Sequence, residues 1–206
     1  MPKGSPELTK TRREEIIKAC ETLYQEIGFK DITIKDIAHL TSFSRPSIYN
    51  YFETKEEIFL AILQKEYDLW VEQMEQRIEE HSSMTRDEVA ETLAETLCER
   101  PQILKILSMN HFDMEANSRL ACLTEFKKSY GATFVTVDRM LRKFCPDMTE
   151  EDRKGFMYSF FPFIYGVYPY TEVTDKQKMA MADAEVPFVY MSAYDMICQV
   201  AKKLLA

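Results

Sequence analysis

The sequence predicts an all-helical protein, and three observations support this fold class. Residues that favour helices, such as Leu, Ala, Glu, Lys, Met and Ile, recur throughout the 206 residues, of which only 5 are glycine. Apolar residues recur every three or four positions, as they do on one face of a helix. No run of alternating polar and apolar residues with turn signals on either side indicates a strand.

Three helices are expected at the N-terminal end. Residues 9–27 carry one apolar stripe at helical spacing. A short second helix is expected over residues 34–40, after Thr33, whose hydroxyl can cap the first turn. A three-residue turn leads to a third short helix, which Ser44 can cap and which ends near Phe52.

Further helices are expected in the rest of the chain. Thr54, Thr85 and Thr149 are each followed three residues later by an acidic residue, which is the pattern of a capping box. Pro162 falls inside one helix and should bend it. We expect an N-terminal domain over residues 1–56 and a larger domain over residues 57–206. The expected helices of this second part cover residues 55–80, 86–99, 101–109, 118–144, 150–168, 175–183 and 187–205.

The acidic residues are concentrated outside the N-terminal group of helices. The formal net charge is −8, of which residues 1–57 contribute −1 and residues 58–206 contribute −7. Proteins that bind nucleic acid through charge alone carry a broadly basic surface. Any contact with DNA must therefore come from a few placed residues in the near-neutral N-terminal group.

No sequence motif indicates an enzyme or a metal site. None of the histidines, His39, His81 and His111, has a Cys or His partner at ligand spacing, and only His39 has an acidic residue three positions before it. The glycine patterns of nucleophile elbows, P-loops and dinucleotide-binding loops do not occur. We therefore expect no enzymatic activity, no catalytic residue, no metal ligand and no cofactor.

The sequence indicates neither a membrane protein nor an exported one. No stretch of 18 apolar residues is present, as a transmembrane helix would need. The first residues, Met1 to Glu7, lack the apolar middle part of a signal peptide. We expect a protein that stays in the cytoplasm and does not enter a membrane.

The second and third helices, with the short turn between them, have the lengths of a helix-turn-helix, whose second helix enters the major groove of DNA. Arg45 can grip a guanine through two hydrogen bonds. Serine and tyrosine hydroxyls can donate to phosphate oxygens, and Lys55 lies at a helix start, where N–H groups and a cation suit a phosphate. The informative residues around the third helix are Ser44, Arg45, Ser47, Tyr49, Asn50 and Tyr51.

Two parts of this N-terminal group have alternative interpretations. Tyr49 and Tyr51 can also be core residues of a plain three-helix packing unit. The segment from Lys10 to Arg13 can reach an adjacent groove of DNA as an arm, or it can be the solvated start of the first helix.

Three segments resemble the DNA-binding signature of the TetR family of transcriptional regulators: Ile34–Ala38, Ser44–Phe52 and Lys55–Phe59. The resemblance covers about residues 10–60, and beyond them it extends only to the number and order of helices. It implies a homodimer with nine or ten helices per subunit. It also implies a protein that represses transcription and leaves DNA when a small ligand enters its C-terminal body.

The same resemblance assigns roles to individual residues. Lys35, Arg45, Pro46, Ser47 and Tyr49 fall at positions where base contacts are usual. The positions where phosphate contacts are usual are occupied by Thr33, Ser44, Tyr49, Tyr51 and Lys55.

The second domain is rich in aromatic residues and methionine, which can line a ligand pocket or simply fill a core. The helix over residues 150–168 is apolar nearly all round, so a partner subunit must bury the side that its own subunit leaves uncovered. The resemblance implies that this helix and the last helix form a dimer interface. An apolar pocket would suit a hydrophobic or aromatic effector, with Tyr130 or His111 as its polar group. The candidate ligand-binding residues are Trp70, Met74, Met109, Phe112, Phe126, Tyr130, Phe134, Phe160 and Phe163.

These observations predict a ligand-responsive, sequence-specific regulator of transcription. In this interpretation, a homodimeric repressor stays on a palindromic double-stranded DNA operator until a hydrophobic small molecule releases it. The alternative is a constitutive DNA-binding architectural or interaction protein without an effector. A filled core in the second domain would favour the alternative.

Overall fold

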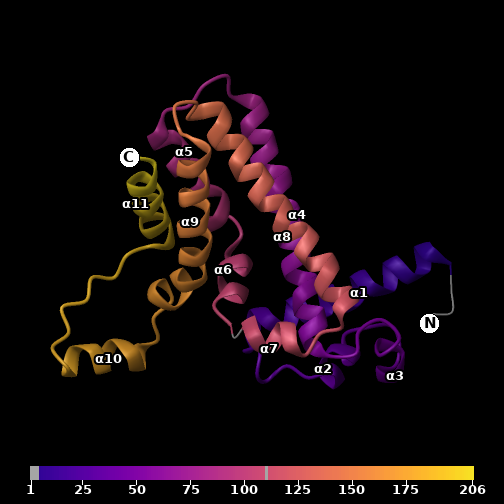
Figure 1. The fold of residues 1–206 in the computed structure, drawn as a ribbon. Coiled ribbons are helices and arrows are strands. Elements are labelled where there is room, and N and C mark those ends of the chain that lie inside the picture. Colours follow the sequence, from indigo (N-terminus) through magenta and orange to yellow (C-terminus); the bar gives the residue numbers. More distant parts are fainter. Residues whose placement is uncertain (1–4, 110) are drawn as a thin grey trace. The chain divides into compact units, whose positions relative to one another are not determined.

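The computed structural model describes residues 5–109 and 111–206, without the side chains of residues 111–113. Within these residues the fold is all-helical, as the sequence predicts, and no strand occurs (Figure 1). The helices are α1 (Pro6–Glu26), α2 (Ile34–His39), α3 (Arg45–Ile48), α4 (Lys55–Glu80), α5 (Arg86–Cys98), α6 (Pro101–Leu107), α7 (His111–Ala116), α8 (Leu120–Phe144), α9 (Glu150–Thr171), α10 (Asp175–Asp183) and α11 (Ala193–Leu205).

Three elements differ from the sequence-based expectation. The regular part of α3 ends at Ile48 rather than near Phe52, because the next residues form hydrogen-bonded turns. The helix α7 was not expected as a separate element. The last helix starts at Ala193 rather than at residue 187, because Ser192 caps it by accepting a 3.0 Å hydrogen bond from the N–H of Asp195.

The chain forms two compact units. The N-terminal unit comprises Met1–Lys65 and Asn110–Ser129, and the C-terminal unit comprises Glu66–Met109 and Tyr130–Ala206. The long helices α4 and α8 each begin in the first unit and end in the second (Figure 1). The domain boundary expected after residue 56 stays a prediction.

Capping boxes start three of the helices. Thr33 before α2, Thr85 before α5 and Thr149 before α9 each accept a hydrogen bond from the third helical N–H, and the acid there accepts one in return. The box expected at α4 is only half formed. Thr54 accepts from the N–H of Glu57, but the Glu57 carboxylate accepts from the N–H of Glu53 at 2.8 Å instead.

The core of the N-terminal unit forms where α1 and the first turns of α4 meet. Phe59 on α4 is fully buried, and its ring meets the edges of Tyr24 at 4.9 Å and Phe29 at 4.8 Å. Such edge-to-face pairs add to the stabilisation that burial of the rings provides. The α2–α3 pair contributes Ile37 and Ile48, which are also fully buried.

The Glu57 carboxylate makes the most extensive polar contact in the N-terminal unit. It is buried and accepts three hydrogen bonds from Arg119: from Nε at 2.7 Å, from Nη2 at 2.7 Å and from the backbone N–H at 2.9 Å. The same guanidinium donates to the carbonyl of Tyr51 at 3.1 Å. The residues that follow α3 are thereby held to the residue that precedes α8.

This ion pair shifts the pKa of both partners. Burial alone would raise the pKa of Glu57, but the hydrogen bonds from Arg119 and from the N–H of Glu53 outweigh it and lower the pKa from 4.5 to about 2. The pKa of Arg119 is raised by its bond to Glu57. The pair therefore stabilises the fold above the ordinary carboxyl pKa, and this stabilisation is lost as the pH falls from 4.5 towards 2.

The C-terminal unit is built around α9, against which α6 and α11 pack, and α11 also packs against α5. Buried aromatic residues on α9, among them Phe156, Phe160 and Phe161, fill its interior. Arg153 is also buried on α9, and it donates to Asp138 at 2.9 Å and to the carbonyl of Met148 at 2.7 Å.

The first prediction concerns the Glu57–Arg119 pair. Arg119→Met should lower the free energy of unfolding by about 2–4 kcal/mol, because it leaves a buried carboxylate without its counter-charge. The expected loss is less than for a fully enclosed pair because the Arg119 side chain is 42% exposed. Urea unfolding at neutral pH measures this loss.

Lys128→Met is the matched control, because it removes a cation from the exposed pair Lys128–Glu125 on the same helix. It should cost no more than about 1 kcal/mol. Equal losses in the two variants would show that the Glu57–Arg119 pair contributes no more to the free energy of unfolding than an exposed ion pair does.

Candidate functional site

The turn between α2 and α3 is held by the first helix. The carboxylate of Glu15 accepts hydrogen bonds from the backbone N–H of Ser42 and from its hydroxyl, the latter at 3.0 Å. The Thr41 hydroxyl donates to the carbonyls of Ala38 at 3.0 Å and Phe43 at 3.1 Å. These contacts fix the path of the chain between the two short helices, as a helix-turn-helix requires.

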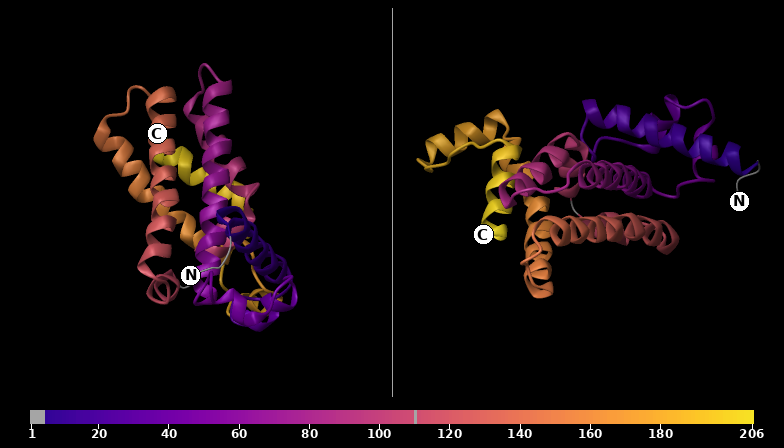
Figure 2. Two further views of the ribbon diagram at one scale, coloured as in Figure 1. Left: turned by 90° about the vertical axis from the view of Figure 1, so that its right-hand side faces the viewer. Right: turned by 90° about the horizontal axis from the view of Figure 1, so that it is seen from above.

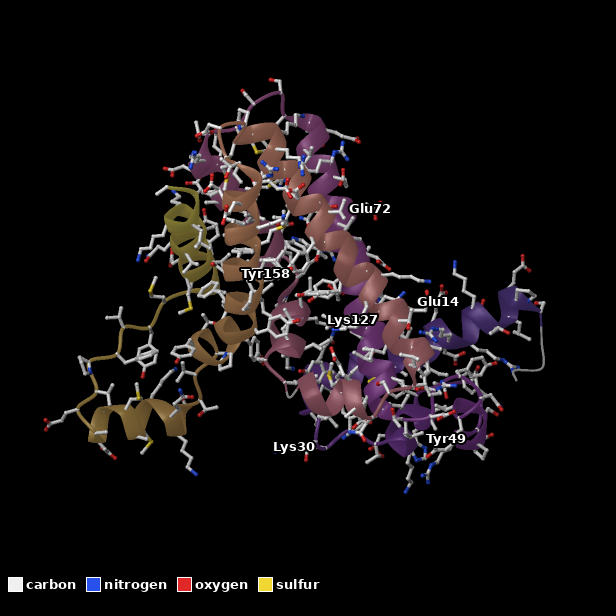
Figure 3. The ribbon with its side chains drawn as sticks, viewed as in Figure 1. Glu14, Lys30, Tyr49, Glu72, Lys127 and Tyr158 are labelled. Atoms are coloured by element: carbon white, nitrogen blue, oxygen red, sulfur yellow. The ribbon has the colours of Figure 1, made fainter. Side chains whose placement is uncertain are left out.

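An exposed polar surface surrounds the start of α3. Arg45, Pro46, Tyr49 and Asn50 are exposed, and Tyr49 lies 44% exposed at the edge of the unit (Figure 3). The Arg45 guanidinium donates to the Tyr49 hydroxyl at 3.2 Å and lies 5.9 Å from the centre of its ring. This contact orients an extended cation beside a phenol on the outer side of the helix, where both remain accessible.

Ser44 precedes α3 but does not cap it with its side chain, contrary to the expectation from the sequence. Its hydroxyl lies 3.2 Å from that of Ser47 instead. The N–H of Ser47, which a side-chain cap would use, donates to the backbone carbonyl of Ser44 at 2.8 Å. The hydroxyl of Ser44 is exposed beside Arg45.

The start of α2 lies in the same unit. Thr33 and Lys35 are exposed, and Thr33 both accepts from the N–H of Asp36 and donates its hydroxyl to the Asp36 carboxylate at 2.6 Å. Hydrogen bonds from the side chain and then the backbone of Thr33 lower the pKa of Asp36. The first turn of α2 therefore keeps a negative charge beside the cation of Lys35.

Two of the expected DNA-binding residues are more enclosed than the others. Tyr51 is only 8% exposed. The Lys55 ammonium donates to the carbonyls of Phe29 at 2.7 Å and Ile32 at 3.1 Å, and lies 3.4 Å from that of Lys30. An ammonium has three donors, so these carbonyls occupy it fully in this structure.

The basic residues near the start of α1 lie within the helix. The guanidinium of Arg12 stands 5.7 Å from the centre of the Phe43 ring, and that of Arg13 stands 4.6 Å from the centre of the Phe52 ring. Both arginines therefore pack against the helix-turn-helix. Lys10 is exposed and pairs with Glu14 at 3.9 Å.

Sequence reasoning missed the residues that support this surface from a distance. Glu15 and Arg119 fix the turn and the end of the α3 region, but each lies far along the chain from its partner. The sequence analysis assigned Glu57 to a capping box with Thr54. No residue near Arg119 in the sequence indicated that Arg119 pairs with Glu57. Such long-range pairs leave no periodic signal in a single sequence.

The C-terminal unit brings part of the expected ligand-binding set together. The rings of Phe134 and Phe161 stack with centres 4.0 Å apart, and Tyr130 meets the edge of Phe134 at 5.0 Å. Trp70 meets Phe161 at 6.4 Å, and its N–H donates to the Thr96 hydroxyl at 3.0 Å. We call Trp70, Tyr130, Phe134 and Phe161 the aromatic cluster.

The other expected ligand-binding residues lie elsewhere. Met74 is buried beside Thr96, whose hydroxyl is 3.5 Å from its sulfur, and Phe160 stacks on Phe156. Phe163 lines an apolar groove on another part of α9. Phe126 is buried in the N-terminal unit, and Met109 is half-buried at the end of the α6 region. The side chains of Phe112 and His111 lie outside the described residues.

Two tyrosines that the sequence did not single out adjoin the aromatic cluster. The Tyr67 ring lies 5.9 Å from that of Tyr130, and Tyr165 is a further neighbour of Tyr67. Burial, and then the neighbouring Tyr165 and Tyr130, raise the pKa of Tyr67 well above its ordinary value. Three phenols therefore gather at one side of an apolar, aromatic region.

The described residues lack the features of two other kinds of site. No group of three or more His, Cys, Asp or Glu side chains is arranged to hold a metal ion there. No helix in the same part of the chain combines the length and apolar character needed to cross a membrane.

Two family models match the chain. The model for bacterial regulatory proteins of the tetR family matches residues 16–62, which include α2 and α3. The model for the tetracyclin repressor-like C-terminal domain matches residues 64–194, more than half of the chain.

Curated relatives match only part of the chain. The uncharacterized HTH-type transcriptional regulator YfiR of Bacillus subtilis (strain 168) is 32% identical over 81 residues, which are 39% of this chain and 40% of that regulator. The chain thus aligns with less than half of the length of this relative.

Solved structures share the fold over nearly the whole chain. The fatty acid degradation regulator FadR from Bacillus halodurans superposes with a TM-score of 0.61 at 14% identity, over 100% of this chain and 97% of that one. FadR from Bacillus subtilis in complex with stearoyl-CoA gives 0.60 at 17% identity, over 94% and 97%. With both family models matched in order, the chain belongs to the TetR family of DNA-binding transcriptional regulators.

Proposed function

We propose that the protein is a homodimeric repressor that binds a palindromic operator through α3 and leaves it when a hydrophobic small molecule enters the C-terminal unit. The observation that carries the DNA-binding part is the exposed polar surface at the start of α3, where Arg45 and Tyr49 are held side by side. A recognition helix contacts base edges with its N-terminal residues.

Within this proposal, the residues around α3 have two roles. Arg45 reads a guanine, with Pro46, Ser47, Tyr49 and Asn50 around it in the major groove. Lys35 adds a base contact from α2. The hydroxyls of Thr33, Ser44, Ser47 and Tyr49 bind phosphates and fix the register.

Tyr51 and Lys55 act differently within the proposal. Because Tyr51 is nearly buried and the Lys55 ammonium already holds the loop at residues 29–32, their side chains support the interface more than they bind phosphate. We assign the phosphate contact to the backbone N–H groups that open α4, where the positive end of the helix lies.

The outer face of α9 is the proposed dimer interface. Tyr158, Pro162, Gly166 and Tyr170 are exposed at intervals of four residues, which places them in one row along the helix. Tyr158 is 73% exposed and is marked in Figure 3. A two-fold axis beside this row would pair two copies. The half-sites of a palindromic operator for such a dimer are expected roughly 34–36 Å, about one helical turn, or slightly more apart.

The aromatic cluster, with the neighbouring tyrosines, is the proposed effector site. An apolar region with a few placed hydroxyls suits an apolar molecule that carries a hydrogen-bonding group. FadR from B. subtilis, which shares this fold, forms a complex with stearoyl-CoA, and this supports a long-chain apolar ligand as one class to test. The burial of Trp70 and Met74 favours a second candidate, a constitutive DNA-binding protein with a filled core.

Arg45 gives the most direct test of the DNA-binding part. An operator is first selected from a random pool of duplex DNA, and binding is followed by fluorescence anisotropy. Arg45→Ala should weaken specific binding by about 1–3 kcal/mol and leave binding to unrelated DNA nearly unchanged, because a base contact is lost.

Arg142→Ala on α8 is the matched control, since it removes one exposed arginine from the C-terminal unit at a position outside the proposed dimer interface. It should leave operator affinity unchanged. Specific binding that survives Arg45→Ala would remove Arg45 from the proposed base contacts.

Trp70 gives the test of the effector part, because it is the only tryptophan and belongs to the aromatic cluster. Acyl-CoA and aromatic compounds are titrated into the operator complex. A compound that releases the operator should change Trp70 fluorescence with the same midpoint. Release without any change at Trp70 would place the effector elsewhere, and binding at Trp70 without release would favour the constitutive protein.

A further inference from the structure

The helix α10 buries none of its residues against its own chain. None of its nine residues, all of which the structure describes, is buried, and Met179 is 67% exposed. Figures 1 and 2 show α10 standing apart from α9 and α11, the helices that precede and follow it in the same unit. Because an isolated helix of this length is marginal in water, a stable α10 needs a surface to dock on.

The segment that follows α10 is apolar and exposed. Residues 186–191 read Val-Pro-Phe-Val-Tyr-Met, and they form no regular structure. Val189 is 77% exposed, Tyr190 is 49% exposed and Val186 is 44% exposed. A contiguous apolar surface of this kind marks an interaction site. We call residues 172–191, which include α10, the arm.

A stacking contact with the end of α9 fixes the base of the arm. The ring of Phe188, on the returning part of the arm, stacks on Tyr170 near the end of α9 with centres 6.2 Å apart, and Tyr190 meets Phe188 at 4.9 Å. Tyr170 lies near the end of α9 and Phe188 lies shortly before the start of α11, so this contact joins the two ends of the arm. The arm is therefore a loop with a defined base, and its outer part projects from that base.

An apolar groove lies beside the same base. Phe163, Gly166 and Tyr170 on α9 line it together with Met196 on α11, and its volume is about 280 Å³. A Cβ added to Gly166 would meet no described atom within 4 Å, so the floor of the groove is open. The groove continues the exposed row of α9 that we assigned to the dimer interface.

We propose that the arm of one subunit packs into the groove of a second copy of the same chain, and that the partner's arm returns the contact. This inference rests on the proposed homodimer and specifies how the two copies hold each other. Each chain carries both an apolar arm and an apolar groove. A single two-fold axis would therefore place the arm of each copy in the groove of the other. The groove is lined by residues of α9 and α11, and neither Val189 nor Val186 of the arm is among them.

The charge of the arm supports a second copy over other occupants. The arm carries Glu172, Asp175, Asp183 and Glu185 against Lys176 and Lys178, so it is slightly acidic. A nucleic acid or an anionic membrane surface would attract a basic segment instead. The apolar side chains of the arm match a groove lined by Phe, Tyr and Met.

Sedimentation equilibrium of the full chain tests the proposal. Val189→Asp should raise the dissociation constant of the dimer by roughly tenfold or more, because an aspartate would be buried without a partner. Val135→Asp is the matched control, since Val135 is a 70% exposed valine on α8 in the same unit. It should leave the dimer unchanged, and thermal unfolding at low concentration should show that both variants fold.

A photo-crosslinker at position 189 identifies what the arm touches. Isotopically heavy and light copies are mixed, and the expected products join position 189 of one copy to peptides containing Phe163 to Tyr170 or Met196 of the other. Crosslinks within single copies only, or a dimer that Val189→Asp does not weaken, would overturn the arm exchange and leave the proposed homodimer standing. A monomeric wild-type chain would overturn both.

Discussion

The position of the α3 region in its unit depends on one buried carboxylate. Glu57 accepts hydrogen bonds from the N–H of Glu53 and from three donors of Arg119, and Arg119 also holds the carbonyl of Tyr51. The end of the α3 region, the start of α4 and the start of α8 therefore meet at one ion pair. Since a buried charge without its partner is costly, these three segments are stable only together.

Local signals in the sequence predicted much of the fold and part of the candidate site. Thr33, Thr85 and Thr149 start their helices as expected, because a capping box involves residues only three positions apart. Arg45 on α3 and Tyr49 directly after it are exposed, as the DNA-binding interpretation requires.

The remaining features depend on contacts that no local pattern encodes. The enclosure of Lys55 follows from carbonyls of the loop before α2, and the role of Arg119 follows from a residue 62 positions away. The start of α11 was placed too early because Pro187 is a common first helical residue, whereas the Ser192 cap determines the actual start. Among the aromatic residues, only the packed structure separates the cluster around Phe161 from Phe163, which faces a groove.

Amide hydrogen exchange of Glu57→Ala tests most directly whether the Glu57 carboxylate holds the segments of the N-terminal unit together. The N–H groups of Glu53 and Arg119 both donate to this carboxylate. The account predicts that their protection, and that of residues 44–57, falls in the variant, while amides of α5, α9 and α11 keep theirs. Unchanged protection at Glu53 and Arg119, or a uniform loss across both units, would contradict it.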